Sequence, residues 1–201
     1  MEITVRRAGE QDRDAVIAAY SIASPDEVVT EWVLDGYPVD EFTPQYVPGL
    51  IDRALRDDQI WLAGTESEIW AVSIWQRVDS MERFEAEAVE ARAMAASVPD
   101  VRPLQRVAVL SDLLASSHPR EFPHWYLQVI VTVPQHRGKG AGGAILADRT
   151  KAISSAGLPA YLEASTERSA RLYTRNGFAA TGTTYDLPEN GPTIRPMWFR
   201  G

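Results

Sequence analysis

The sequence predicts an α/β fold in a single domain, residues 1–201, built on a mixed sheet. Segments with the two-residue period of strands alternate with segments of helical period, which favours a sheet covered by helices. The 201-residue length suits one domain, and the 45% hydrophobic fraction supplies a core. Cysteine is absent, which excludes a disulfide scaffold and cysteine-based chemistry.

The first 120 residues are expected to hold three strands and most of the helices. Thr43 and Pro44 predict a helix start, since proline is favoured at the first helical position. A polar connection at 65–67 predicts a hairpin between two strands. In order, the expected elements are a strand at 3–6, helices at 11–23, 32–34 and 43–56, strands at 59–64 and 68–75, and helices at 82–97 and 104–116. The last two helices form a predicted insertion, about 78–120, between the third and fourth strands.

The last third of the chain changes character. Its strand at 124–133 is the longest strand signal, and Pro134 ends it. Gly157 and Pro159 predict the end of the following helix. The expected elements are that strand, a helix at 140–156, a strand at 160–165, a helix at 167–176, and strands at 178–185 and 193–199 around a turn at 188–192.

Charge and composition exclude several function classes. The net charge is −8, with 23 acidic and 11 basic residues in 1–123 against 5 and 9 in 124–201. An acidic chain argues against nucleic-acid binding, and no apolar run is long enough for a membrane span. The charged start lacks a signal-peptide core, which predicts a cytoplasmic protein. The three histidines lack the spacing of a helical metal pair, so we expect no metal site.

The most informative stretch is 131–143, where a strand ends, glycines follow and a helix begins. Such a turn directs backbone N–H groups to one point at the positive end of a helix, which is an anion site, most naturally for phosphate. Arg137 and Lys139 add positive charge. A glycine-rich turn that binds nothing is the alternative, but glycines at a helix start cost helix stability and so require a reason.

Two anionic ligands compete for this turn. Gly138, Gly140 and Gly143 satisfy GxGxxG, and Glu163 follows Gly138 by 25 residues, as a dinucleotide-binding motif requires. However, four residues separate the strand from Gly138, and the motif stands late in the chain. The other spacing is Arg137-x-x-Gly140-x-Gly142.

That second spacing resembles the acetyl-CoA pyrophosphate loop of the GNAT superfamily of N-acetyltransferases. The strand at 161–163 and the run Ala170-Arg171-Leu172-Tyr173-x-x-x-Gly177-Phe178 resemble the next motif of that superfamily. The resemblance covers roughly 124–185. Within the superfamily the pattern is nearest to puromycin N-acetyltransferase-like enzymes, which share His118-Pro119 and the turn at 188–192.

The resemblance implies a mostly antiparallel sheet, splayed at the acetyl-CoA-binding strand, with acetyl-CoA as cosubstrate and no metal. It assigns the pantetheine arm and thioester oxygen to the backbone of three residues on that strand, in the manner of an oxyanion hole. The implied acetyl-CoA-binding residues are Val131, Thr132, Val133, Arg137, Gly138, Lys139, Gly140, Ala141, Gly142 and Gly143. The superfamily often has an Asn early in the second helix. Here that place falls near Thr166 and Glu167, which leaves the contact from that helix unassigned.

The resemblance also implies catalytic residues, each with a structural alternative. Tyr173 would protonate the departing thiolate, or would only line the core side of its helix. Glu163 would act as general base, or would be a structural glutamate. Trp32, Tyr37 and Gln128 are the candidates for binding the acceptor. Most of the six tryptophans are expected in the core, and Gln128 could equally be a satisfied core amide.

The expected activity is direct acetyl transfer from acetyl-CoA to a primary amine of a small molecule, with amine-bearing antibiotics and related metabolites as candidates. Without cysteine, no thioester acyl-enzyme forms on the protein. The alternatives are a protein or peptide amine as acceptor, a non-catalytic acetyl-CoA sensor, and an NAD(P)-dependent oxidoreductase. We expect no nucleic-acid or membrane partner, and a monomer or a homodimer.

Overall fold

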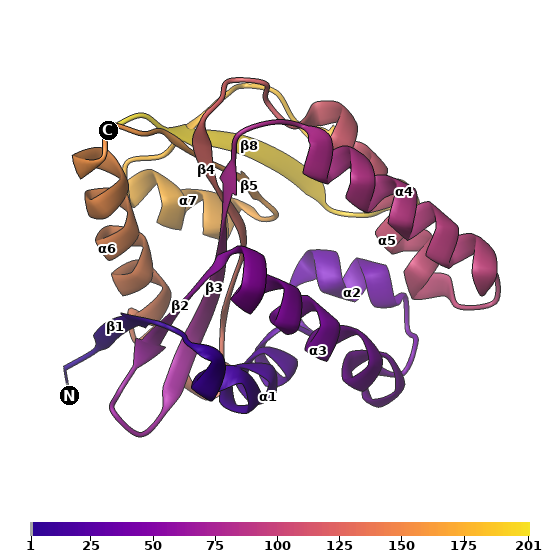
Figure 1. Cartoon of the computed structure of the whole chain (residues 1–201), viewed down its shortest axis with the longest axis horizontal. Helices are drawn as coiled ribbons and strands as arrows, with labels where there is room; N and C mark the ends of the chain where they lie inside the picture. Colours follow the sequence, from indigo (N-terminus) through magenta and orange to yellow (C-terminus); the bar gives the residue numbers. More distant parts are fainter. Residues whose placement is uncertain (1) are drawn as a thin grey trace.

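A computed structural model describes residues 2–201 as one open, eight-stranded sheet with helices on both faces (Figure 1). The strand order is β1-β2-β3-β4-β5-β8-β6, and β7 pairs with β8. The β4–β5 pair is parallel, and every other pair is antiparallel. This confirms the predicted mixed, mostly antiparallel sheet flanked by helices.

Most elements lie where the sequence places them. They are β1 (Thr4–Arg7), η1 (Glu10–Asp12), α1 (Arg13–Ala23), α2 (Val28–Leu34), α3 (Val39–Asp57), β2 (Gln59–Gly64), β3 (Ile69–Val78), α4 (Glu82–Ser97), α5 (Arg102–Ser117), β4 (His124–Thr132), η2 (Pro134–His136), α6 (Ala141–Ser155), β5 (Ala160–Ala164), α7 (Glu167–Arg175), β6 (Ala179–Ala180), β7 (Tyr185–Asp186) and β8 (Thr193–Phe199).

The predicted start of α3 is wrong. The helix begins at Val39 with Pro38 as its N-cap, so Thr43 is no cap and Pro44 lies inside the helix. Asp40 and Glu41 lie in the first turn, where acidic side chains favour the positive end of the helix dipole. Pro44 and Pro48 both lie inside the helix, so each removes one backbone hydrogen bond from it.

The predicted strand at 178–185 is also wrong. It is divided into the two-residue strands β6 and β7, with Gly182 between them at φ +87°. This left-handed conformation breaks an extended run and is accessible to glycine without strain. The Thr181 amide still donates to the Pro196 carbonyl, which holds the segment against β8.

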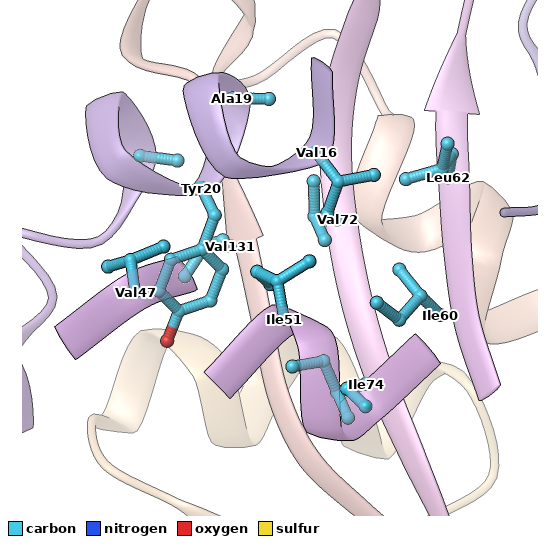
Figure 2. Close-up of a cluster of buried hydrophobic side chains, with 12 residues drawn as sticks. Val16, Ala19, Tyr20, Val47, Ile51, Ile60, Leu62, Val72, Ile74 and Val131 are labelled. Carbon is cyan, nitrogen blue, oxygen red and sulfur yellow. The ribbon is translucent and has the colours of Figure 1, made fainter. Parts of the chain in front are cut away.

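The two faces of the sheet have separate cores. On one face α1 and α3 cover β2, β3 and β4, with Val16 and Ile51 fully buried among aliphatic side chains (Figure 2). On the other face α6 covers β2, β3 and β4, and α7 covers β5 and β6, around Trp75, Leu146 and Phe178. The sheet is therefore held from both sides, and its interior strands are buried on both faces.

The predicted insertion is the antiparallel pair α4 and α5, which connects β3 to β4 and lies next to α2 (Figure 1). Phe84 of α4 packs with Tyr126, Tyr161 and Trp198 on the sheet. The start of α4 is also tied to the end of α3, because Arg83 donates to both carboxylate oxygens of Asp58, at 2.5 and 2.9 Å. The insertion therefore forms part of the wall over the middle of the sheet.

The central feature is a divergence of β4 and β5. They pair only between 125–127 and 160–162. Beyond this ladder β4 continues beside β3, and β5 continues beside β8. On β4 the register against β3 shifts between Leu127 and Val129, so that Gln128 is the extra residue of a bulge. A bulge bends a strand and increases its local twist, which turns β4 away from β5.

The Asp58–Arg83 pair gives a stability prediction. Burial raises the pKa of Asp58 and the Arg83 hydrogen bonds oppose that rise. We expect Arg83→Met to lower the free energy of unfolding by about 2–4 kcal/mol, because it leaves a buried carboxylate unpaired. Chemical denaturation at pH 7 measures this change.

Arg53→Met is the matched control, since Arg53 reaches Glu87 and Glu90 only at 3.4 Å on the surface. It should cost less than about 1 kcal/mol. Equal losses in the two variants would contradict the assignment of a structural role to the Asp58–Arg83 pair.

Candidate active site

The gap between β4 and β5 exposes one edge of β4. The Val133 amide donates to the Trp70 carbonyl of β3 at 2.8 Å. Because alternate residues of a strand direct their backbone groups to the same side, Val131 also faces β3, whereas Ile130 and Thr132 face the gap. Of the three predicted pantetheine-binding residues, only Thr132 therefore directs its amide towards the gap. The amide of Ile130, which was not predicted, also faces the gap.

The glycine turn follows β4 and places the start of α6 at the end of this edge. Gly138 has φ +78° and Gly140, the N-cap of α6, has φ +93°. Both values lie in the left-handed region that favours glycine. The amides of Ala141, Gly142 and Gly143 have no acceptor within the helix, as in the first turn of any α-helix. The predicted strand, glycine turn and helix are thus confirmed, and their geometry suits an anion.

His136, Trp70 and Glu68, which the sequence analysis did not select, hold this turn in place together with Lys139. The His136 ring stacks on Trp70 with centroids 4.6 Å apart, and its Nε2 lies 2.9 Å from Glu68 Oε1. The Lys139 ammonium donates to His136 Nδ1 at 3.2 Å, which leaves Nε2–H to donate to Glu68. The hydrogen bonds from His136 and Trp70 lower the pKa of Glu68. The turn is therefore anchored to the β2–β3 hairpin.

The link between α1 and α2 joins both arms of the gap. Arg137, after β4, pairs with Asp26, with Nη2 and Oδ1 2.5 Å apart. Glu27 accepts a hydrogen bond from Ser165, after β5, at 2.7 Å. The same Glu27 carboxylate caps α2 by accepting from the Val29 amide at 3.0 Å. Two adjacent residues thus fix the two diverging strands, and the Arg137 side chain is already engaged within the protein.

Tyr173 lies in α7 on the face of that helix that meets the core. Its side chain is 7% exposed and packs with Phe178, with ring centroids 6.1 Å apart. Burial, and to a lesser extent the charge of Glu27, raises the pKa of Tyr173 well above its usual value. The phenol is therefore protonated at neutral pH, which an acid requires. The cap of α7 is Thr166, whose hydroxyl accepts from the Ser169 amide at 3.0 Å.

Glu163 lies on β5, directly after the residues that pair with β4. Its side chain is 8% exposed. Burial raises the pKa of Glu163 to about 7, and hydrogen bonds from Tyr126 and Tyr161 partly oppose the rise. His118 Nδ1 lies 4.0 Å from the carboxyl Oε1. A carboxyl that titrates near neutral pH can accept a proton efficiently at that pH.

The three predicted acceptor residues are not brought together. Gln128 is the bulge residue where β4 and β5 part. Trp32 is 7% exposed and its indole donates to the Pro188 carbonyl at 3.0 Å, under the 188–192 turn. A side chain at Gly191 would come within 2.7 Å of this indole, which explains the glycine. Tyr37 packs edge-on against Phe42 in α3.

Two further features bear on the class of site. Within residues 2–201, no three His, Cys, Asp or Glu side chains are grouped so that they could hold a metal ion. No helix in that part of the chain has the length and apolarity needed to cross a membrane.

Comparison with known proteins agrees with this geometry. Residues 107–178 match the Acetyltransferase (GNAT) family. The whole chain is similar to a Corynebacterium glutamicum structure described as histone acetyltransferase HPA2 and related acetyltransferase, with 24% identity, a TM-score of 0.67, and 98% of this chain and 96% of that chain covered.

Two insect enzymes are similar as well. The Drosophila melanogaster polyamine N-acetyltransferase, which forms N-acetylagmatine, has 18% identity and a TM-score of 0.68, with both chains fully covered. The Aedes aegypti arylalkylamine N-acetyltransferase 2 has 15% identity and a TM-score of 0.73, with 98% of each chain covered. The chain has the fold of these acetyltransferases, and the family match within it supports the GNAT acetyltransferase family.

Proposed function

We propose that this protein is an N-acetyltransferase that moves the acetyl group of acetyl-CoA directly to a primary amine of a small molecule. The observation that carries the proposal is the open edge of β4, which leads into the glycine start of α6. One strand thus offers backbone groups for a thioester arm and, at its end, helix amides for a pyrophosphate. The family match over 107–178 spans both parts.

The chain supplies groups for each step of the reaction. The amides of Gly138 and of 140–143, with the Lys139 side chain nearby, would hold the pyrophosphate, and Ile130 and Thr132 would hold the thioester arm. Glu163 would take a proton from the acceptor ammonium, so that the neutral nitrogen attacks the thioester carbon. As the C–S bond breaks, Tyr173 would donate its proton to the thiolate. The nitrogen, now bonded to the acetyl carbon, would give up a proton that restores the phenol, and Glu163 would release its proton to solvent.

The acceptor is proposed from charge and from the similar structures. The acidic excess lies in residues 1–123, and it favours a cation as the acceptor. The similar insect enzymes are named for polyamine and arylalkylamine substrates. A small amine, including an amine-bearing antibiotic or metabolite, is the first candidate, and a peptide amine is the second.

A thiol-release assay with acetyl-CoA and a panel of amines tests this proposal. The panel contains a polyamine, an arylalkylamine, an amine-bearing antibiotic and a peptide with a free N-terminus. We expect free thiol with at least one small amine, and the protein adds no thiol background because it lacks cysteine. Acetyl-CoA binding without thiol release for any amine would instead favour the sensor, and binding of NAD(P) alone would favour the oxidoreductase.

Tyr173→Phe tests the acid. We expect kcat to fall by about 100-fold or more, because the thiolate loses its proton donor, while the Kd for acetyl-CoA stays within about twofold. Steady-state kinetics and calorimetry measure the two quantities. Tyr46→Phe, at a partly exposed tyrosine in α3, is the control and should leave both unchanged. Turnover that survives Tyr173→Phe would remove Tyr173 from this role.

Glu163→Gln tests the base through pH. A base must be ionised to act, so kcat/KM of the unaltered protein should rise with pH around a midpoint near 7, the raised pKa of Glu163. The variant should lose most activity and this rise. Glu167→Gln, at an exposed residue of α7, should keep both.

The same variant should alter stability with a defined sign. Since the pKa of Glu163 is raised on folding, the folded chain keeps a proton that the unfolded chain has lost, and stability falls as pH rises from about 4.5 to 7. Relative to the unaltered protein, Glu163→Gln should therefore gain up to about 3 kcal/mol at pH 8 and little at pH 4. If stability depended on pH equally in Glu163→Gln and in the unaltered protein, this would contradict a raised pKa for the buried Glu163 carboxyl.

A further inference from the structure

A buried histidine pair lies directly behind Glu163, and no step of the proposed reaction uses it. His118, at the end of α5, is 3% exposed, and His124, at the start of β4, is 0% exposed. Their Nε2 atoms lie 3.0 Å apart. His124 Nδ1 lies 2.7 Å from the backbone carbonyl of Glu121. His118 Nδ1 has no hydrogen-bond partner and points to Glu163 Oε1, 4.0 Å away.

These contacts fix the position of each proton. A carbonyl oxygen only accepts, so His124 must carry its proton on Nδ1 and donate it to Glu121. A neutral His124 then has a lone pair on Nε2, and His118 must donate Nε2–H to it. A neutral His118 is consequently left with a lone pair on Nδ1, facing Glu163. Burial lowers the pKa of both histidines, that of His118 to about 3, which favours the neutral rings that this chain of bonds requires.

The lone pair on His118 Nδ1 determines which protonation state of Glu163 can form a hydrogen bond on this side. A carboxylate facing an imidazole lone pair gains no hydrogen bond there. A protonated carboxyl can donate to it once the two atoms, which are 4.0 Å apart and not hydrogen-bonded, approach by about 1 Å. Hydrogen bonding to the neutral form of an acid disfavours its ionisation. The buried Oε1 of Glu163 is itself without a partner, as expected for an atom that lacks a donor opposite it.

We propose that His118 and His124 are positioning residues. The Glu121 carbonyl fixes the tautomer of His124, His124 fixes that of His118, and His118 therefore presents a lone pair to Glu163. This lone pair keeps Glu163 able to accept and hold the proton of the acceptor amine. Neither imidazole touches the reacting atoms. They act by presenting an acceptor, and not a donor, to the base. This inference rests on the proposed role of Glu163.

Aromatic rings and a few charged groups surround the histidine pair. Phe84 of α4 stacks on His118 with centroids 3.9 Å apart, and Trp198 of β8 packs edge-on against His124. The titratable or charged groups that bear on the cluster are Arg77 and Asp79 at the end of β3, Glu87 of α4, Glu121 before β4, Tyr126 of β4 and Tyr161 of β5. The two tyrosine hydroxyls lower the pKa of Glu163, whereas His118 presents a lone pair to it.

The direct test is nitrogen NMR of the unaltered protein at pH 7, which identifies which imidazole nitrogen carries hydrogen. We expect His124 to be protonated on Nδ1 only and His118 on Nε2 only. A hydrogen on His118 Nδ1 would overturn the proposal. This measurement does not depend on acetyl transfer. It therefore distinguishes an error in the predicted histidine tautomers from an error in the proposed function.

His124→Asn tests the consequence for Glu163. The asparagine N–H can replace Nδ1–H at Glu121, but the shorter side chain places no acceptor where His124 Nε2 lies. His118 is then free to move its proton to Nδ1 and donate to the Glu163 carboxylate. The midpoint of the rise of kcat/KM with pH should shift down by about one unit. An unchanged midpoint in the folded variant would overturn the proposal.

His118→Asn provides a second variant, since its amide N–H can face Glu163 directly, and the midpoint should again move down. Phe84→Leu is the packing control, because it removes the stacked ring and retains every proton. It should lower the melting temperature without moving the midpoint. A shift as large in Phe84→Leu as in the histidine variants would show a purely structural role. Full activity in Glu163→Gln would instead overturn the proposed base, whatever the tautomers are.

Discussion

β4 and β5 share a parallel ladder of three residue pairs and then separate, and the arrangement of the candidate site follows from this separation. Two strands that stayed paired would satisfy their backbone groups with each other. Because they diverge, the groups of Ile130 and Thr132 face a gap, and such polar groups require a partner. The bulge at Gln128 bends β4 at the point of separation, and β8 holds β5 on its own path.

The separated strands are stabilised by contacts from distant parts of the chain. Asp26 and Glu27, adjacent in sequence, bind the residues that follow β4 and β5 respectively. His136 and Glu68 fix the glycine turn to the β2–β3 hairpin. The insertion α4–α5 covers the other side of β5 and brings His118 behind Glu163. Three features therefore border the gap. The glycine turn suits an anion, Tyr173 lies among apolar side chains, and the buried Glu163 carboxyl lies next to the neutral His118 ring.

The sequence predicted the parts of this arrangement that are local. The glycine turn was predicted because left-handed glycines and the start of a helix leave a signature within a few residues, and the strand before it has a strong pattern of its own. The start of α3 was predicted wrongly because Pro44 suits a first helical position, although the helix already begins at Val39. The strand at 178–185 was predicted wrongly because a glycine inside a strand-like run does not reveal its left-handed conformation. The pairs Asp26–Arg137, Glu68–His136 and His118–Glu163 join residues far apart in sequence, so that no local pattern contains them. Which amides of β4 face the gap also depends on its register with β3.

Hydrogen exchange with and without acetyl-CoA tests the central claim, that the gap and the glycine turn form one binding site. We predict that acetyl-CoA slows exchange at the amides of Ile130 and Thr132 and at those of Gly138 and 140–143 together. The amides of Val133, already bonded to Trp70, and of Lys139, already bonded to His136, should change little. Protection confined to other segments, or protection of the turn without the edge of β4, would contradict it.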